Sequence, residues 1–302
     1  MNIADFIDTW VLGLAAATLR YATPLTLAAL GGLFSERAGV VNIALEGLMV
    51  AGAFFAMFGS VVTGHWLGGL LFAVVAGALL ASLHAIASIT FRADQIISGT
   101  ALILLAAGLV NFLNITIYGS QGTPPDVSRV PEIPQAVPVI GGLSLLIPVM
   151  IGLLLLTSYI VFRTPFGLHL RAVGEHPRAA DTVGIDVIKM RYIAVILSGV
   201  FAGLAGAYLS FDVGSYTENM VGGKGFIALA ALIFGKWRPW GAFGASLLFG
   251  FAQAFGDRLQ NEFAVSPELV TSLPYVITLI ALAGFVGKSV APAASGKPYV
   301  KG

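Results

Sequence analysis

The sequence predicts an all-α membrane protein with about nine membrane-spanning helices. Hydrophobic residues make up 57% of the 302-residue chain, only 10% of residues are charged, and the mean hydropathy is +0.91. Several apolar runs exceed the length of about 18 residues that marks a membrane-spanning helix, for example 67–87, 96–117, 143–162 and 269–286. Because a soluble core does not need so many such runs, we expect one transmembrane domain over residues 1–302.

The expected spans follow the apolar runs in order. The first carries Arg20 near its middle, the third to fifth are nearly unbroken apolar runs, and the second and seventh begin with polar, glycine-rich residues. The opening segment MNIADFIDTW has no basic residue, so it lacks the n-region of a signal peptide and we expect it to be retained. We place the spans at about 10–33, 43–63, 66–90, 95–118, 143–162, 192–210, 214–235, 239–256 and 268–287.

Basic residues predict which loops face the cytoplasm. The loop 163–191 is rich in lysine and arginine, and short loops of that kind lie on the cytoplasmic side. Alternating the spans outward from this loop puts the N-terminus outside and the C-terminal tail, 288–302, inside. The cytoplasmic basic residues are then Arg37, Arg92, Arg163, Arg171, Arg178, Lys189, Arg191, Lys236, Arg238, Lys288, Lys297 and Lys301, and the outer ones are Arg129, Lys224 and Arg258.

Three places depart from a regular apolar span. A charged side chain in the middle of a span costs about 2.5–3.5 kcal/mol on insertion into the membrane. The Arg20 side chain must therefore reach the membrane interface, pair with an acidic group, or lie inside the bundle. The alternative is that residues 1–20 lie along the membrane surface. The segments 31–49 and 214–242 interrupt apolar sequence with glycine and polar residues. We interpret both as broken helices, which are typical of transport sites, while their glycines are also compatible with close helix packing alone.

Two readings remain open for the polar residues of the first break. Asn42 and Glu46 are four residues apart, so on a helix they face the same side and could line a translocation pathway. Alternatively they tie the broken helix to neighbouring spans, with Glu46 paired to Arg37 or Arg20. We assign a pathway role to Gly39, Asn42, Glu46, Ser98 and Asn111.

Several kinds of chemistry find no support in the sequence. The chain has no cysteine, and histidines 65, 84, 169 and 176 lack metal-ligand spacing, so we expect no metal site, no bound cofactor and no catalytic residues. The run LAGFVGKS, 282–289, resembles a phosphate-binding loop but has Leu282 where the first glycine is required. His84 stands alone and is best interpreted as a satisfied core residue.

The stretch GEHPRAADTVGIDVIKMR, 174–191, is strongly charged and flanked by apolar sequence. Pro177 can open a helix, residues 178–183 can form about two turns, and Gly184 can end it in the left-handed conformation. The alternative is an ordinary solvated loop. As a docking element, the stretch would seat closely through Ala179 and Ala180 and offer charged contacts from Glu175, Arg178 and Asp181.

The motifs RAVGEHPRAADTVGIDV, SGVFAGLAGAYLS, LGGLFSERAGVVNIALEGLMVAGAF and RADQIISGTAL resemble the permease subunits of ATP-binding-cassette (ABC) importers, over about residues 20–288. The resemblance is to bacterial permeases for nucleosides and simple sugars, which are related to branched-chain amino-acid and ribose permeases. It implies that the loop 163–191 carries a coupling helix for an ATPase subunit, with Ala179, Ala180 and Gly184 at its motif positions. His176 departs from the family, which often has the better N-cap Asn there.

The resemblance also implies partners and location. We expect a permease in the bacterial plasma (inner) membrane, with ATP bound by a separate ATPase subunit, a second and different permease chain, and an external lipoprotein or periplasmic protein that delivers substrate. We expect no nucleic-acid partner. Nucleosides are the favoured substrates, with simple sugars and branched-chain amino acids as alternatives. A rival of another class is an ion-coupled secondary transporter with Glu46 as its coupling carboxylate, and a membrane enzyme would need a catalytic cluster that we do not find.

Overall fold

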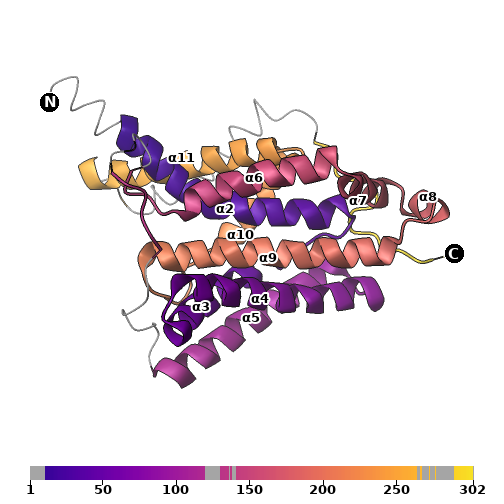
Figure 1. Cartoon of the computed structure of the whole chain (residues 1–302), viewed down its shortest axis with the longest axis horizontal. Helices are drawn as coiled ribbons and strands as arrows, with labels where there is room; N and C mark the ends of the chain where they lie inside the picture. The colour runs from indigo at the N-terminus through magenta and orange to yellow at the C-terminus, as the bar shows by residue number, and fades with distance from the viewer. Residues whose placement is uncertain are drawn as a thin grey trace.

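The computed structural model describes residues 11–119, 130–135, 137, 141–263, 266, 272, 276 and 289–301. Within these ranges the chain is mainly helical, with an isolated β-bridge between Glu132 and Ser144. Figure 1 shows most of the long helices running side by side. They are α2 (Gly13–Arg37), α3 (Leu45–Thr63), α4 (Trp66–Ala85) with the π-helical turn η2 (Ile86–Thr90), α5 (Gln95–Tyr118), α6 (Leu146–Arg163), α7 (Pro165–Glu175), α8 (Pro177–Thr182), α9 (Val187–Val213), α10 (Lys224–Phe234) and α11 (Pro239–Phe263).

A multi-pass membrane protein is confirmed, and its span count stays a prediction. Five described helices are long and apolar enough to cross a membrane: α3, α4 with η2, α5, α6 and α9. Helices α2 and α11 have 25 residues each but are less apolar, with mean hydropathies below those of the five. The expected ninth span, 268–287, and the first ten residues lie outside the described residues.

Helix α9 begins five residues earlier than the apolar pattern predicts. The Asp186 side chain caps the helix by accepting a hydrogen bond of 2.9 Å from the backbone N–H of Lys189. An N-cap of this kind satisfies an amide that has no partner inside the helix, so the first turn forms although it is charged. The helix therefore extends from the membrane into the charged stretch 174–191.

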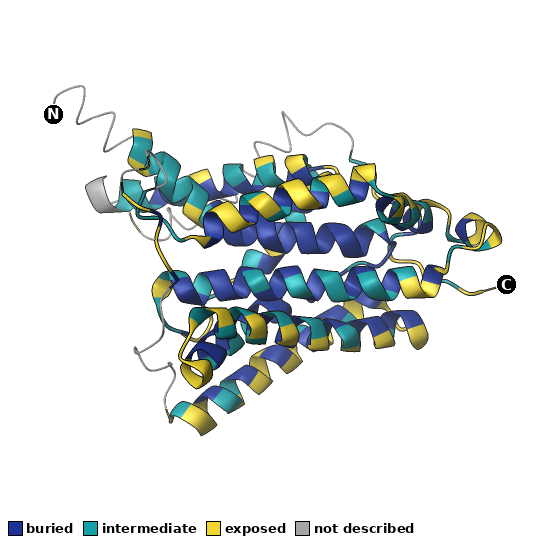
Figure 2. Cartoon of the chain, viewed as in Figure 1, coloured by how far each residue is buried: buried dark blue, intermediate teal, exposed yellow. Residues whose placement is uncertain are grey.

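Helix α9 is the centre of the bundle. It packs against α2, α3 and α4, while α11 packs on the other side of α2. Figure 2 shows α2 and α9 largely buried between their neighbours, whereas α5 lies at the edge of the bundle and exposes much of its length. Of the most apolar 18-residue window of α5, 22% is buried, so this helix is left to contact lipid or another chain.

Glycines bring α9 into backbone contact with α3 and α4. A Cβ atom added to Gly52 would lie 2.6 Å from the Cα atom of Gly203, and one added to Gly77 would lie 2.2 Å from the carbonyl oxygen of Gly199. No side chain can move aside at these contacts, because the neighbouring atoms are backbone. Small residues of this kind allow close helix packing in membranes, where the hydrophobic effect does not drive helices together.

Both predicted interruptions of the helices are present. The first lies between α2 and α3, where Gly39 adopts a φ angle of +87° that other residues rarely tolerate. The second lies between α9 and α10, where residues 214–223 are not helical. Helix α10 has 11 residues, a length of about 16 Å at 1.5 Å per residue, which is about half of a 30 Å hydrocarbon layer. The expected span 214–235 is therefore half irregular chain and half helix.

Replacing Gly203 by valine should prevent the α3–α4–α9 packing. The added side chain meets backbone atoms of α4, 2.4 Å from the Ala73 carbonyl oxygen, so we expect a loss at or beyond the upper end of the about 1–3 kcal/mol typical of overpacking. Gly108→Val is the matched control, since no atom lies within 4 Å of a Cβ atom there. Size-exclusion profiles and thermal midpoints in detergent measure both. Equal, well-folded behaviour of the two variants would contradict the packing described here.

Candidate functional site

One end of the bundle collects most of the described basic residues, and we call it the coupling end. Three contacts bring its segments together: the Arg191 guanidinium donates to the Ala38 carbonyl, Arg37 to the Trp237 carbonyl, and the Thr90 and Tyr192 hydroxyls hydrogen-bond. The end of α2, the end of η2, the start of α9 and the α10–α11 turn therefore lie at one end of the bundle, the end from which α7 and α8 project (Figure 1). The basic residues there are Arg37, Arg92, Arg163, Arg171, Arg178, Lys189, Arg191, Lys236, Arg238, Lys297 and Lys301.

The short helix predicted in the charged stretch is present as α8. Pro177 is its first residue, and Gly184 follows its end with a φ angle of +84°, as the glycine pattern predicts. The His176 side chain makes no capping hydrogen bond. The departure from Asn at this position therefore leaves the helix in place but without a side-chain N-cap.

The two alanines of α8 face different ways. Ala180 is 3% exposed and packs with Val173 and Val187, whereas Ala179 is exposed. The sequence suggested that both would seat against another surface, but a six-residue helix shows too little periodicity to reveal its buried side. Ala179 and the exposed residues 182–184 form the outward surface of the helix.

The charged residues around α8 also differ in their contacts. The Glu175 carboxylate accepts a hydrogen bond of 3.2 Å from the Ala293 backbone N–H, and the Asp181 carboxylate lies near Tyr299, with which it lines a second hollow. Desolvation and the nearby Asp181 carboxylate raise the pKa of the Tyr299 phenol. Arg178 is exposed and makes no hydrogen bond or ion pair with any described residue. The acidic side chains are thus engaged inside the chain, while this cation is available.

A segment that sequence analysis missed holds α8 in place. Residues 289–301, which we call the tail, run along the coupling end from α10 to α8. The Ser289 hydroxyl donates to the Ile233 carbonyl at 2.8 Å, and the Ala294 N–H donates to the Gly174 carbonyl at 2.9 Å. The tail is rich in alanine, proline and glycine and has no hydrophobic periodicity, so no sequence signal indicates that it packs.

Arg191 joins the tail to the first helix break. Its side chain is 1% exposed, and it donates to the Ala38 carbonyl at 3.1 Å and to the Lys297 carbonyl at 3.0 Å. Ala38 follows the last turn of α2, where helix carbonyls lack partners and carry partial negative charge. Gly39 lies directly beneath, since a Cβ atom there would be 2.9 Å from an Arg191 nitrogen. Gly39 is therefore packed under the tail.

The two breaks meet at Glu46. Its carboxylate, at the start of α3, accepts hydrogen bonds from the backbone N–H groups of Gly223 at 2.8 Å and Gly225 at 2.7 Å. A carboxylate at a helix N-terminus satisfies free amides and interacts favourably with the helix dipole. Lys224, expected on the outer side, is the first residue of α10. Glu46 therefore holds α10, and it pairs with neither Arg37 nor Arg20.

The rest of the first break also contacts neighbouring helices, although the buried Asn42 Oδ1 atom has no hydrogen-bond partner among the described residues. The Asn42 amide donates to the Ser198 hydroxyl at 2.9 Å, and Asn42 has no exposed surface. His84 hydrogen-bonds through one ring nitrogen to the Val41 carbonyl and through the other to Ser98, both at 3.0 Å, so it is a satisfied core residue as expected. Asn111 lies half-exposed on α5, away from these groups. These contacts favour the scaffold reading of Asn42 and Glu46.

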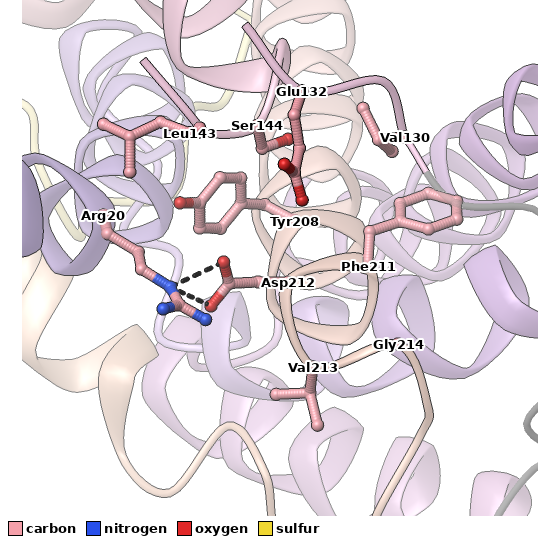
Figure 3. Close-up of a pocket in the computed structure, with 11 residues that line it drawn as sticks. Arg20, Val130, Glu132, Leu143, Ser144, Tyr208, Phe211, Asp212, Val213 and Gly214 are labelled. Carbon is pink, nitrogen blue, oxygen red and sulfur yellow. Dashed lines mark hydrogen bonds and ion pairs between the residues drawn. The ribbon is translucent and has the colours of Figure 1, made fainter. Parts of the chain in front are cut away.

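A polar hollow lies at the opposite end of the bundle (Figure 3). The Arg20 guanidinium donates to both carboxylate oxygens of Asp212 at 2.7 and 2.8 Å, which answers how this cation is accommodated: it pairs at the end of α9. Glu132 and Ser144 line the same hollow of about 220 Å³. Among the described residues, no three His, Asp or Glu side chains are close enough together to hold a metal ion.

Comparison with known proteins gives a family for this architecture. A model described as branched-chain amino acid transport system/permease component matches residues 14–282. The guanosine ABC transporter permease NupQ of Bacillus subtilis is 46% identical, over 95% of this chain and 96% of its own length. The nucleoside ABC transporter permease NupC of Lactococcus lactis is 41% identical over 100% of this chain and 99% of its own length. A second Bacillus subtilis guanosine permease, NupP, is 25% identical over 89% of this chain and 80% of its own length. No solved structure matches the chain.

Glu46→Gln should loosen the junction of the two breaks. An amide offers one acceptor oxygen where the carboxylate offers two, so one amide of α10 loses its partner at a cost of about 1–3 kcal/mol. We expect the thermal midpoint of the purified chain to fall, by about 2–4 °C per kcal/mol. Glu218→Gln, in the break 214–223 and exposed, is the control. An unchanged midpoint combined with altered substrate preference would instead support the pathway reading.

Proposed function

This chain belongs to the family described as branched-chain amino acid transport system/permease component, and we propose that it is the permease subunit of a nucleoside importer. As an ABC permease it is a non-catalytic transport subunit in the membrane. The observation that supports a nucleoside substrate is the sequence identity of 46% and 41%, over nearly the full length, to permeases named for guanosine and nucleosides. Such identity over whole chains supports a shared class of substrate.

We propose that the coupling end faces the cytoplasm of a bacterial inner membrane. The concentration of lysine and arginine at that end supports this orientation, because short basic loops are retained on the cytoplasmic side. The hollow around Arg20 and Asp212 then faces outward, toward the protein that delivers substrate. In this orientation the N-terminus is outside and the tail is inside.

The proposed complex contains ATPase subunits that bind ATP, a second permease, and an external binding protein. The exposed α8 surface supports ATPase docking, because it is a short rigid helix presented outside the bundle. Two different guanosine permeases from one Bacillus subtilis strain match this chain at 46% and 25%, which supports a heterodimer of permeases. The ATPases close on ATP, and their movement shifts the permease pair between outward-open and inward-open populations.

The engagement of Glu46 argues against an ion-coupled transporter. A coupling carboxylate must release and take up a proton or ion, yet both Glu46 oxygens accept hydrogen bonds from the start of α10. Protonation would remove one of these acceptors and destabilise the helix start. ATP hydrolysis by a partner subunit therefore remains the proposed source of energy.

Uptake into proteoliposomes tests the proposed function. The whole complex, reconstituted with its ATPase, second permease and binding protein, should accumulate labelled guanosine only with hydrolysable ATP, and unlabelled uridine or adenosine should compete. Glucose and leucine serve as competitors for the two alternative substrate classes. Competition by glucose or leucine but not by nucleosides would overturn the substrate, and accumulation without ATP would overturn the ABC mechanism.

Gly184→Arg should separate the ATPase from the permease. The long cation adds bulk to the outward surface of α8 and strains a backbone with a φ angle of +84°. We expect ATPase co-purification to fall by about tenfold while the chain still inserts. Gly64→Arg is the matched control, because Gly64 is also left-handed, at +69°, with no atom within 4 Å, and lies at the other end of the bundle. Normal co-purification with Gly184→Arg would show that the loop is a solvated connector.

A further inference from the structure

A groove lies between α8 and the tail. It has a volume of about 550 Å³, with residues 176–179 on one wall and residues 297–300 on the other. The tail borders α8 on a second side as well, because Tyr299 and Asp181 line a further hollow together. Any protein that docks on the exposed side of α8 must therefore meet the tail as well.

The tail is held firmly enough to act as a wall. Chain segments beyond the last helix usually fray unless contacts tie them down. This one is tied to α7 through the Gly174 carbonyl, to α9 through Arg191, and to α10 through the bond from Ser289 to the Ile233 carbonyl. Its position relative to α8 is consequently defined by three separate helices.

The groove presents apolar surface beside a free cation. Val300, which lines the groove, is 51% exposed, and Val183, on the outward surface of α8 beside it, is 75% exposed, although both lie outside the apolar spans. Arg178 has no described partner, whereas the neighbouring Glu175 and Asp181 carboxylates are engaged with the tail. Apolar contacts with a charged rim are characteristic of protein interfaces, and an unpaired arginine favours a carboxylate.

We propose that the ATPase subunit docks in this groove, contacting tail residues 298–300 as well as α8, and that one of its acidic side chains pairs with Arg178. This inference rests on the proposed function and adds the tail to the docking surface. A partner acid is required because the basic groove leaves none of its own carboxylates free. The tail also carries contact with the ATPase toward the α2–α3 break, because Arg191 binds the Lys297 and Ala38 carbonyls together.

Cysteine protection tests the docking surface, since the chain has no cysteine of its own. Single cysteines replace Val300 in the tail and Ala179 in α8, and Ala93→Cys, exposed in the η2–α5 loop at the coupling end, is the control. Labelling by a maleimide is followed in inside-out vesicles that contain the whole complex or lack only the ATPase. We expect the ATPase to slow labelling at positions 300 and 179 by about tenfold and to leave position 93 unchanged.

The outcomes separate the two proposals. Protection at 179 but not at 300 overturns the role of the tail as a docking wall, leaves it as an internal strap, and keeps the proposed function. Absence of protection at both positions overturns the docking of α8 and, with it, the proposed coupling to an ATPase. Equally slow labelling at both positions in vesicles with and without the ATPase would mean that lipid or another part of the complex covers the groove, and it would also overturn the proposal.

Charge reversal tests the acidic partner. Arg178→Glu should reduce ATPase recovered with the chain by about tenfold, because reversing one member of an interfacial charge pair replaces attraction by repulsion. Arg178→Lys should retain most of the recovery, and Arg92→Glu, exposed in the η2–α5 loop, should retain all of it. Full recovery with Arg178→Glu would overturn the pairing of this arginine with a carboxylate.

Discussion

Inside a hydrocarbon layer, a backbone amide outside a helix has no water to bind, and Glu46 supplies the missing acceptor for the start of α10. Its two carboxylate oxygens hold the amides of Gly223 and Gly225, so a helix of half the membrane thickness can begin within the bundle. This one group connects the break after α2 to the break after α9. Irregular backbone can survive in the bundle because each break supports the other, with Ser198 accepting from the Asn42 amide and His84 bonding the Val41 carbonyl.

The same principle governs the coupling end. Arg191 is buried without a carboxylate, yet it finds two backbone carbonyls that would otherwise lack donors. The end of α2, the start of α9 and the tail are therefore fixed to one another by a single side chain. A charged group that would be costly in isolation thus holds the tail beside α8, the helix that we propose docks on the ATPase.

Features encoded by neighbouring residues could be predicted from the sequence. Long apolar runs marked the spans, Pro177 and Gly184 marked α8, and Gly39 marked the first break. Contacts between distant residues could not, because no local pattern specifies them. Arg20 and Asp212 are 192 residues apart, and Arg191 and Lys297 are 106 apart. For the same reason Asn42 and Glu46 were recognised as important polar residues, but their partners on α9 and α10 were not.

The glycine contacts of α9 also determine which parts of the bundle can slide. Side chains between two helices can change rotamer and allow small shear movements, but where backbone touches backbone there is no such compliant layer. Gly52 meets Gly203, and Gly77 meets Gly199, so α3, α4 and α9 have no room to shift separately. They form a rigid body, and the rearrangement that admits a solute must turn this body as a whole against its surroundings.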